Sequence, residues 1–146
     1  MSRTGGLGIR FGRKEMACTW ELERLLISEG WAVVAGVDEA GRGPLAGPVV
    51  AAAVVLPAEY FHPQLNDSKK LTERVRSAVY EEITGDGSIH WASARASVEE
   101  IDAINIWEAT QLAAARALAA LPVEVGMALV DGRPMRRATF AEVSAL

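Results

Sequence analysis

Two apolar runs rich in β-branched residues frame a segment with too much glycine and proline for regular secondary structure. The runs span residues 32–37 and 49–56, and residues 38–48 between them read Asp-Glu-Ala-Gly-Arg-Gly-Pro-Leu-Ala-Gly-Pro. Both runs are apolar throughout rather than alternating, which predicts two strands that are covered on both faces. The segment between them is expected to be a loop that begins where the first strand ends.

Helix and strand signals continue along the chain. Thr72 is expected to cap a helix, Ser97 begins the spacing of a capping box, and Asn105 marks a further helix start. Strands followed by strands alternating with helices predict an α/β fold, a mixed β-sheet flanked by helices. Helices are expected from residue 15 to Gly30, from Thr72 to Gly85, from Ser97 to Ile104 and from Asn105 to Pro122, and further strands at residues 88–96 and 125–130.

Length and composition restrict the class of protein. A chain of 146 residues, half of them hydrophobic, is expected to form a single domain. Residues 1–14 hold four glycines and four basic residues, so we predict a flexible basic tail there and one domain over residues 15–146. Cys18 is the one cysteine, which excludes a disulfide framework. No run has the length of a membrane span or of a signal peptide, so we expect a cytoplasmic protein.

Three acidic residues stand where apolar runs end. Asp38 and Glu39 follow the first run directly, and Asp131 follows the last. Loops beyond strand ends commonly bind ligands, and carboxylate oxygens suit a divalent cation such as Mg²⁺ or Mn²⁺. Adjacent strand residues point to opposite faces, so Asp38 and Glu39 converge only if the backbone bends, which Gly41 and Gly43 would permit. The alternative is that Asp38 and Asp131 begin ordinary turns and that Glu39 is solvated.

The segment Gly41-Arg42-Gly43 is a second candidate binding element. Two glycines let a backbone approach a ligand closely, and their amides can donate hydrogen bonds to its oxygens. An arginine between them can bind a phosphate through two parallel hydrogen bonds. The alternative is a tight connection between two strands in which Arg42 is solvated.

A short basic segment is the third candidate. The chain has 15 basic and 19 acidic residues, a net charge of −4, which excludes binding of nucleic acid by bulk positive charge. Residues 67–76 nevertheless carry four basic and two acidic side chains, a local charge of +2. Such a patch suits a nucleic-acid backbone, although a solvated helix start would look the same. The four tryptophans are expected in the core, and the two histidines have no ligand-like spacing.

Four segments in the right order resemble ribonuclease HII. They are residues 37–53, 65–71, 100–106 and 130–132, and the first of them is highly specific. The resemblance implies an RNase H-like mixed sheet and a two-metal mechanism that uses Mn²⁺ or Mg²⁺. It implies an endonuclease that hydrolyses the RNA strand of RNA–DNA hybrids and cuts at single ribonucleotides in duplex DNA.

The same resemblance assigns roles to individual residues. Asp38, Glu39 and Asp131 correspond to catalytic carboxylates that bind metal. The glycine-arginine-glycine element corresponds to the part that recognises the ribonucleotide 2′-hydroxyl, and a further segment corresponds to one that lies along the nucleic-acid backbone. The substrate-binding residues so implied are Gly41, Arg42, Gly43, Ser68, Lys69 and Lys70. The expected partners are hybrids and ribonucleotide-containing duplexes, bound by a monomer without a membrane.

One departure from the family pattern bears on activity. The family places a fourth catalytic aspartate soon after the third, followed by helices, whereas Glu142 is the one acidic residue after Asp131 and sits in no matching motif. We therefore expect an RNase H-like catalytic domain whose C-terminal part is missing. Two alternatives remain: an inactive nucleic-acid-binding fragment of the same fold, and an RNase H-like junction resolvase, which would have no 2′-hydroxyl to recognise.

Overall fold

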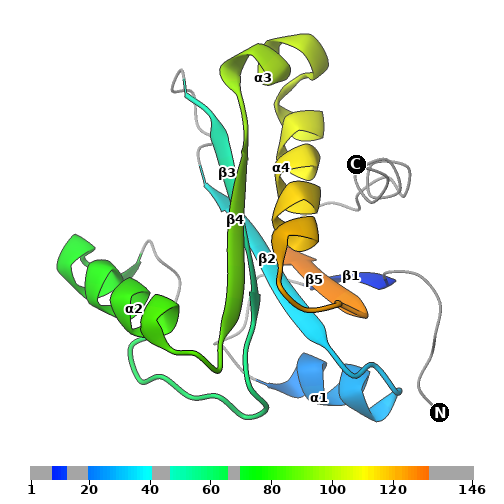
Figure 1. The fold of residues 1–146 in the computed structure, drawn as a ribbon, viewed down its shortest axis with the longest axis vertical. Helices are drawn as coiled ribbons and strands as arrows, with labels where there is room; N and C mark the ends of the chain where they lie inside the picture. The colour runs from blue at the N-terminus through cyan, green and yellow to red at the C-terminus, as the bar shows by residue number, and fades with distance from the viewer. Residues whose placement is uncertain (1–7, 13–19, 41–46, 66–69, 132–146) are drawn as a thin grey trace.

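The computed structural model describes residues 8–12, 20–40, 47–65 and 70–131, which form one mixed β-sheet with helices beside it (Figure 1). The strand order is β1-β5-β2-β3-β4. Neighbours β2, β3 and β4 are antiparallel, whereas β5 runs parallel to both β1 and β2. The elements are β1 (Gly8–Gly12), α1 (Glu21–Ser28), β2 (Val34–Ala40), β3 (Val49–Val55), α2 (Glu73–Gly85), β4 (His90–Ala96), α3 (Val98–Ile104), α4 (Ile106–Ala120) and β5 (Met127–Asp131). The predicted α/β class with a mixed sheet is confirmed.

Three helices begin at the polar residues that the sequence indicated. The side-chain oxygens of Thr72, Ser97 and Asn105 accept hydrogen bonds from the backbone amide three residues later, at 3.3, 3.1 and 3.0 Å. These bonds satisfy amides that a helix start otherwise leaves unpaired. Asn105 also has a positive φ of 83°, which turns the chain between α3 and α4 and keeps them separate helices.

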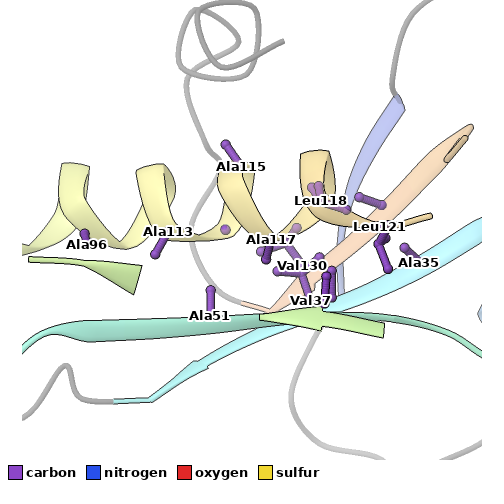
Figure 2. Close-up of a cluster of buried hydrophobic side chains, with 14 of the residues drawn as sticks. Ala35, Val37, Ala51, Ala96, Ala113, Ala115, Ala117, Leu118, Leu121 and Val130 are labelled. Atoms are coloured by element: carbon purple, nitrogen blue, oxygen red, sulfur yellow. The ribbon is translucent and has the colours of Figure 1, made fainter. Parts of the chain in front are cut away.

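The core lies between α4 and one face of the sheet. Helix α4 packs on β2, β3 and β4, and Figure 2 shows Ala113 and Ala117 pointing toward the strands. Alanine dominates both sides of this contact, and small side chains let the helix lie close to the sheet. The buried alanines are Ala35, Ala51, Ala53, Ala92, Ala96, Ala109, Ala113, Ala114, Ala115, Ala117 and Ala128.

Strand β2 is longer at its end than the sequence predicted. It continues to Ala40, so Asp38 and Glu39 lie inside the ladder opposite Ala52 and Ala51 rather than beyond the strand. The prediction that the strand ends at residue 37 is therefore wrong. The physical reason is that pairing with β3 sustains the extended backbone, which outweighs the weak β-propensity of acidic residues.

Two further expectations differ from the structure. Residues of β3 alternate between buried and exposed, and Val50 is 41% exposed, so β3 is not covered on both faces among the described residues. Trp91 on β4 is 39% exposed rather than part of the core. Both residues lie on the sheet face away from α4, and a strand's own sequence does not reveal which face a helix covers.

The N-terminal region contains a strand inside the segment predicted as a flexible tail. Residues Gly8–Gly12 pair in parallel with β5, from Gly8 opposite Met127 to Gly12 opposite Asp131. Without β1, β5 would be an edge strand with unpaired amides and carbonyls, which gives even a glycine-rich segment a reason to be extended. Among the described residues, no helix is long and apolar enough to span a membrane.

Candidate active site

The carboxyl ends of β2 and β5 meet at one end of the sheet. The two strands are parallel and pair from Val34 opposite Met127 to Val37 opposite Val130. Strand β4 also ends there, because Ala96 pairs with the first residue of β3. Ala40, which ends β2, and Val49, which begins β3, therefore lie at the same end of the sheet. Ligands of α/β sheets are commonly bound at this end of the strands.

Two of the predicted carboxylate residues occupy neighbouring register positions. Asp38 and Asp131 each follow directly after the last residue pair of β2 and β5, Val37 with Val130. Paired strands lie about 4.8 Å apart. Residues some ninety positions apart in the sequence are thus brought side by side by the parallel pairing. Asp131 is described as a strand position, and its side chain lies outside the described part of the structure.

Asp38 and Glu39 lie on opposite faces of the sheet. Asp38 is exposed and pairs with exposed Ala52, whereas Glu39 is half-buried and pairs with Ala51 under α4. The backbone amide of Glu39 donates to Oδ1 of Asp38 at 2.9 Å, which holds the Asp38 carboxylate close to its own strand. The bend that would bring both carboxylates together is not found within β2, and residues 41–46 lie outside the described residues.

The donor chemistry fits a divalent cation. Asp38, Glu39 and Asp131 offer hard oxygen ligands from two neighbouring strands, the type that Mg²⁺ and Mn²⁺ bind. Among the side chains that are described, no three His, Cys, Asp or Glu residues form a group that could hold a metal ion. The Asp131 side chain is not among them, so the three-carboxylate set remains a prediction.

Most of the predicted substrate-binding residues lie outside the described ranges. This holds for Gly41, Arg42 and Gly43 and for Ser68 and Lys69. Lys70 is described and exposed, two residues before the Thr72 cap of α2. Its side chain is therefore accessible to solvent.

Sequence reasoning missed two polar residues that share a face with Asp38. Asp38 pairs with Ala52, which pairs with Ser93, and two residues further along each strand Ala40, Val50 and Arg95 form the next row of that face. Ser93 and Arg95 are both exposed. In a strand over residues 88–96, the alternation of side chains puts Ser93 and Arg95 on the same side. Only the register between strands shows that this side carries Asp38.

Comparison with known sequences gives one family. The family model described as ribonuclease HII matches residues 35–143. The ribonuclease HII of Dechloromonas aromatica is 59% identical over 100 residues, covering 68% of this chain and 50% of the relative. The ribonuclease HII of Macrococcus caseolyticus is 41% identical over 149 residues, covering 97% of this chain and 56% of the relative. The chain spans about half the length of the curated relatives it matches.

Solved structures agree on the fold. The ribonuclease H2 from Pyrococcus horikoshii OT3 has a TM-score of 0.59 and 27% identity, over 76% of this chain and 55% of that chain. Bst-RNase HIII, solved in complex with Mn²⁺, has a TM-score of 0.59 over 77% of this chain and 40% of that chain. Its identity is 20%, so that likeness shows the fold alone. The expected RNase H-like fold is thereby confirmed.

Proposed function

Because the chain belongs to the ribonuclease HII family, we propose that it serves as a metal-dependent endonuclease. Its substrates are the RNA strand of RNA–DNA hybrids and single ribonucleotides within duplex DNA. The observation that carries this proposal is the placement of Asp38 and Asp131 at neighbouring positions of paired parallel strands. Glu39, the next residue of β2, lies at the same end of the sheet but on the opposite face, and a bend of the backbone would be needed to bring its carboxylate to the other two.

The reaction accounts for the need for carboxylates at this end of the sheet. Hydrolysis of a phosphodiester builds negative charge on the phosphoryl oxygens, and a bound Mg²⁺ or Mn²⁺ stabilises that charge and helps to generate the nucleophile from water. Asp38, Glu39 and Asp131 would hold the cation, since carboxylates repel both one another and a phosphate without it.

Substrate recognition falls to the segments that flank these strands. Gly41 and Gly43 would let the backbone approach the ribonucleotide, whose 2′-hydroxyl both donates and accepts hydrogen bonds. Arg42 would pair with a phosphate. Ser68, Lys69 and Lys70 would follow the nucleic-acid backbone, and the exposure of Lys70 supports this role. We further infer that the protein is a cytoplasmic monomer without a membrane partner.

The test is cleavage of a DNA duplex that contains one ribonucleotide, with Mn²⁺ or Mg²⁺ and with an all-DNA duplex as the substrate control. We expect a cut on the 5′ side of the ribonucleotide by the wild-type chain. Asp38→Asn should lower the rate roughly 10²–10³-fold, because losing a metal-binding charge removes several kcal/mol of transition-state stabilisation and each 1.36 kcal/mol is tenfold in rate. Its Oδ1 can still accept the Glu39 amide, so folding should be retained.

Asp102→Asn is the matched control, since Asp102 is an exposed aspartate on α3. It should cleave like the wild type. Equal rates for Asp38→Asn and Asp102→Asn would refute the assignment of Asp38.

A second candidate function is nucleic-acid binding without cleavage. This candidate is favoured by the observation that the chain spans only about half the length of the relatives it matches. Folded wild-type chain that binds the ribonucleotide duplex but leaves it uncut at every metal concentration would establish this candidate over the first.

A further inference from the structure

Helix α2 has little apolar contact with the rest of the protein. It lies at the side of β4 that is away from α4 (Figure 1), and Val79 is its one buried residue. Tyr80 meets Trp91 of β4 edge-on, with 6.4 Å between the ring centroids, but Tyr80 is itself 60% exposed. Packing through so narrow an apolar stripe fixes a helix weakly. Polar contacts therefore have a large share in setting the position of α2.

His62 makes such a contact between α2 and the loop that precedes it. Nε2 of His62 lies 2.5 Å from Oε2 of Glu82 on α2, and the backbone amide of Gln64 donates to Nδ1 at 3.1 Å. A neutral imidazole carries one N–H, so an accepting Nδ1 leaves the proton on Nε2, which donates it to Glu82. The His62 side chain is 8% exposed, although it belongs to a loop. Both ring nitrogens are thus used, and the ring is enclosed.

The loop that carries His62 is itself held on α1. Nε1 of Trp20 donates to the carbonyl oxygen of Tyr60 at 2.7 Å. Arg24 donates two hydrogen bonds to the carboxylate of Glu59, at 2.7 and 2.5 Å. A guanidinium that binds a carboxylate through two bonds restricts the geometry of both partners. His62 therefore joins α2 to a loop that has its own support.

The other end of α2 carries basic residues of the segment 67–76. Lys70 precedes the Thr72 cap, and Arg74 and Arg76 lie near the start of the helix; all three are exposed. Glu82 comes ten residues after Thr72, which is about 15 Å along a helix axis. Because a short helix is stiff, a tether near one end determines where the residues at the other end are placed.

We propose that His62 is a positioning residue for substrate binding, which acts through Glu82 to hold α2 so that Lys70 and the two arginines meet the nucleic-acid backbone together. This inference rests on the proposed function, in which the basic segment binds that backbone. The sign of one effect separates it from bulk electrostatics. Removing the negative charge of Glu82 by itself favours a polyanion, whereas losing the tether weakens its binding.

The experiment measures binding of a fluorescent DNA duplex with one ribonucleotide by anisotropy, without divalent cations so that binding is separated from cleavage. Glu82→Ala should raise Kd about three- to tenfold and reduce the slope of log K against log salt by about one phosphate contact. Glu81→Ala is the matched control, because it removes the same charge from the neighbouring exposed position of α2. It should leave Kd unchanged or lower it. With Mn²⁺, Glu82→Ala should raise KM and leave kcat unchanged.

Two near-isosteric substitutions separate the contacts of His62. The Oδ1 of an asparagine can accept the Gln64 amide, but this side chain is too short to reach Glu82, whereas a glutamine can donate to Glu82 from Nε2. His62→Gln should therefore bind the duplex like the wild type, and His62→Asn should bind it as weakly as Glu82→Ala. In a double-mutant cycle, Arg74→Ala should cost less in the His62→Asn background than in the wild type. Circular dichroism and a cooperative thermal transition establish that each variant is folded.

The outcomes separate this inference from the proposed function. Binding by Glu82→Ala that equals binding by Glu81→Ala would overturn the inference, as would equal binding by the two His62 variants or an additive double-mutant cycle. A wild-type chain that binds the duplex but never cuts it, with the variants in the expected order, retains the inference and refutes the proposed cleavage. Cleavage by every variant with the wild-type KM does the reverse. A folded wild-type chain that binds no duplex refutes both.

Discussion

Asn105 should be a position where glycine stabilises the protein and alanine destabilises it. The residue has φ 83° and ψ 164°, a region of backbone space that is essentially restricted to glycine and costs a residue with a Cβ about 1–3 kcal/mol. Its side chain returns part of that cost by accepting the Glu108 amide at 3.0 Å. Alanine keeps the strain and loses the cap, which costs about 1 kcal/mol. Glycine loses the strain, while the lost cap costs only a few tenths.

Glycine also loses more backbone entropy on folding, which costs about 0.5–1 kcal/mol relative to alanine. With that cost subtracted, Asn105→Gly should be more stable than Asn105→Ala by roughly 2 kcal/mol. For a chain of this size that corresponds to a difference in Tm of about 4–8 °C. Urea unfolding of the wild type and both variants, with equal m-values as the check on two-state behaviour, measures it. An alanine variant as stable as the glycine variant would refute the argument, because it would mean that the backbone at residue 105 is unstrained.

Three other predictions concern the candidate site and the stability of the protein at low pH. Arg42→Ala should reduce the preference for a ribonucleotide over a deoxyribonucleotide more than it changes the Mn²⁺ concentration for half-maximal cleavage, and equal losses in the two assays would mean that Arg42 only shapes the site. Removing divalent cations with EDTA should abolish cleavage reversibly and leave the circular dichroism spectrum unchanged, because the described core is formed by apolar residues; cleavage that survives EDTA would contradict metal dependence. The Ser88 hydroxyl and amide donate to Asp86 at 2.6 and 2.9 Å and hold the pKa of Asp86 below its ordinary value of 3.8. The stability that the ionised Asp86 carboxylate contributes is therefore present above pH 3.8 and is lost as the pH falls toward the lowered pKa. Asp86→Ala should flatten the dependence of the unfolding free energy on pH below pH 3.8, and an unchanged slope in that range would contradict this.

Local signals in the sequence were sufficient for the helix starts. Thr72, Ser97 and Asn105 each combine a capping side chain with a following amphipathic pattern, and a cap acts within one turn of its own residue. The sequence therefore contained everything that decides where α2, α3 and α4 begin. The carboxylates were likewise recognised because acidic residues at the ends of apolar runs need a partner.

Pairing between distant strands decided the features that the sequence did not reveal. The extension of β2 through Asp38 and Glu39 depends on β3, and the position of Asp38 beside Asp131 depends on the parallel register with β5. The exposure of Val50 and Trp91 depends on which face α4 covers. The glycine-arginine-glycine element and residues 66–69 lie outside the described residues, so their role in substrate binding stays a prediction.

The alanine contact between α4 and the sheet limits how this domain can change over evolutionary time. An alanine can be shortened only to glycine, so cavity-forming substitutions are almost unavailable at Ala51, Ala113 or Ala117. Any larger side chain must push two layers apart, at about 1–3 kcal/mol of a total stability of about 5–15 kcal/mol. Sequence drift at this interface is therefore confined to exchanges among the smallest residues, or to paired substitutions in which one layer gives up the volume that the other gains.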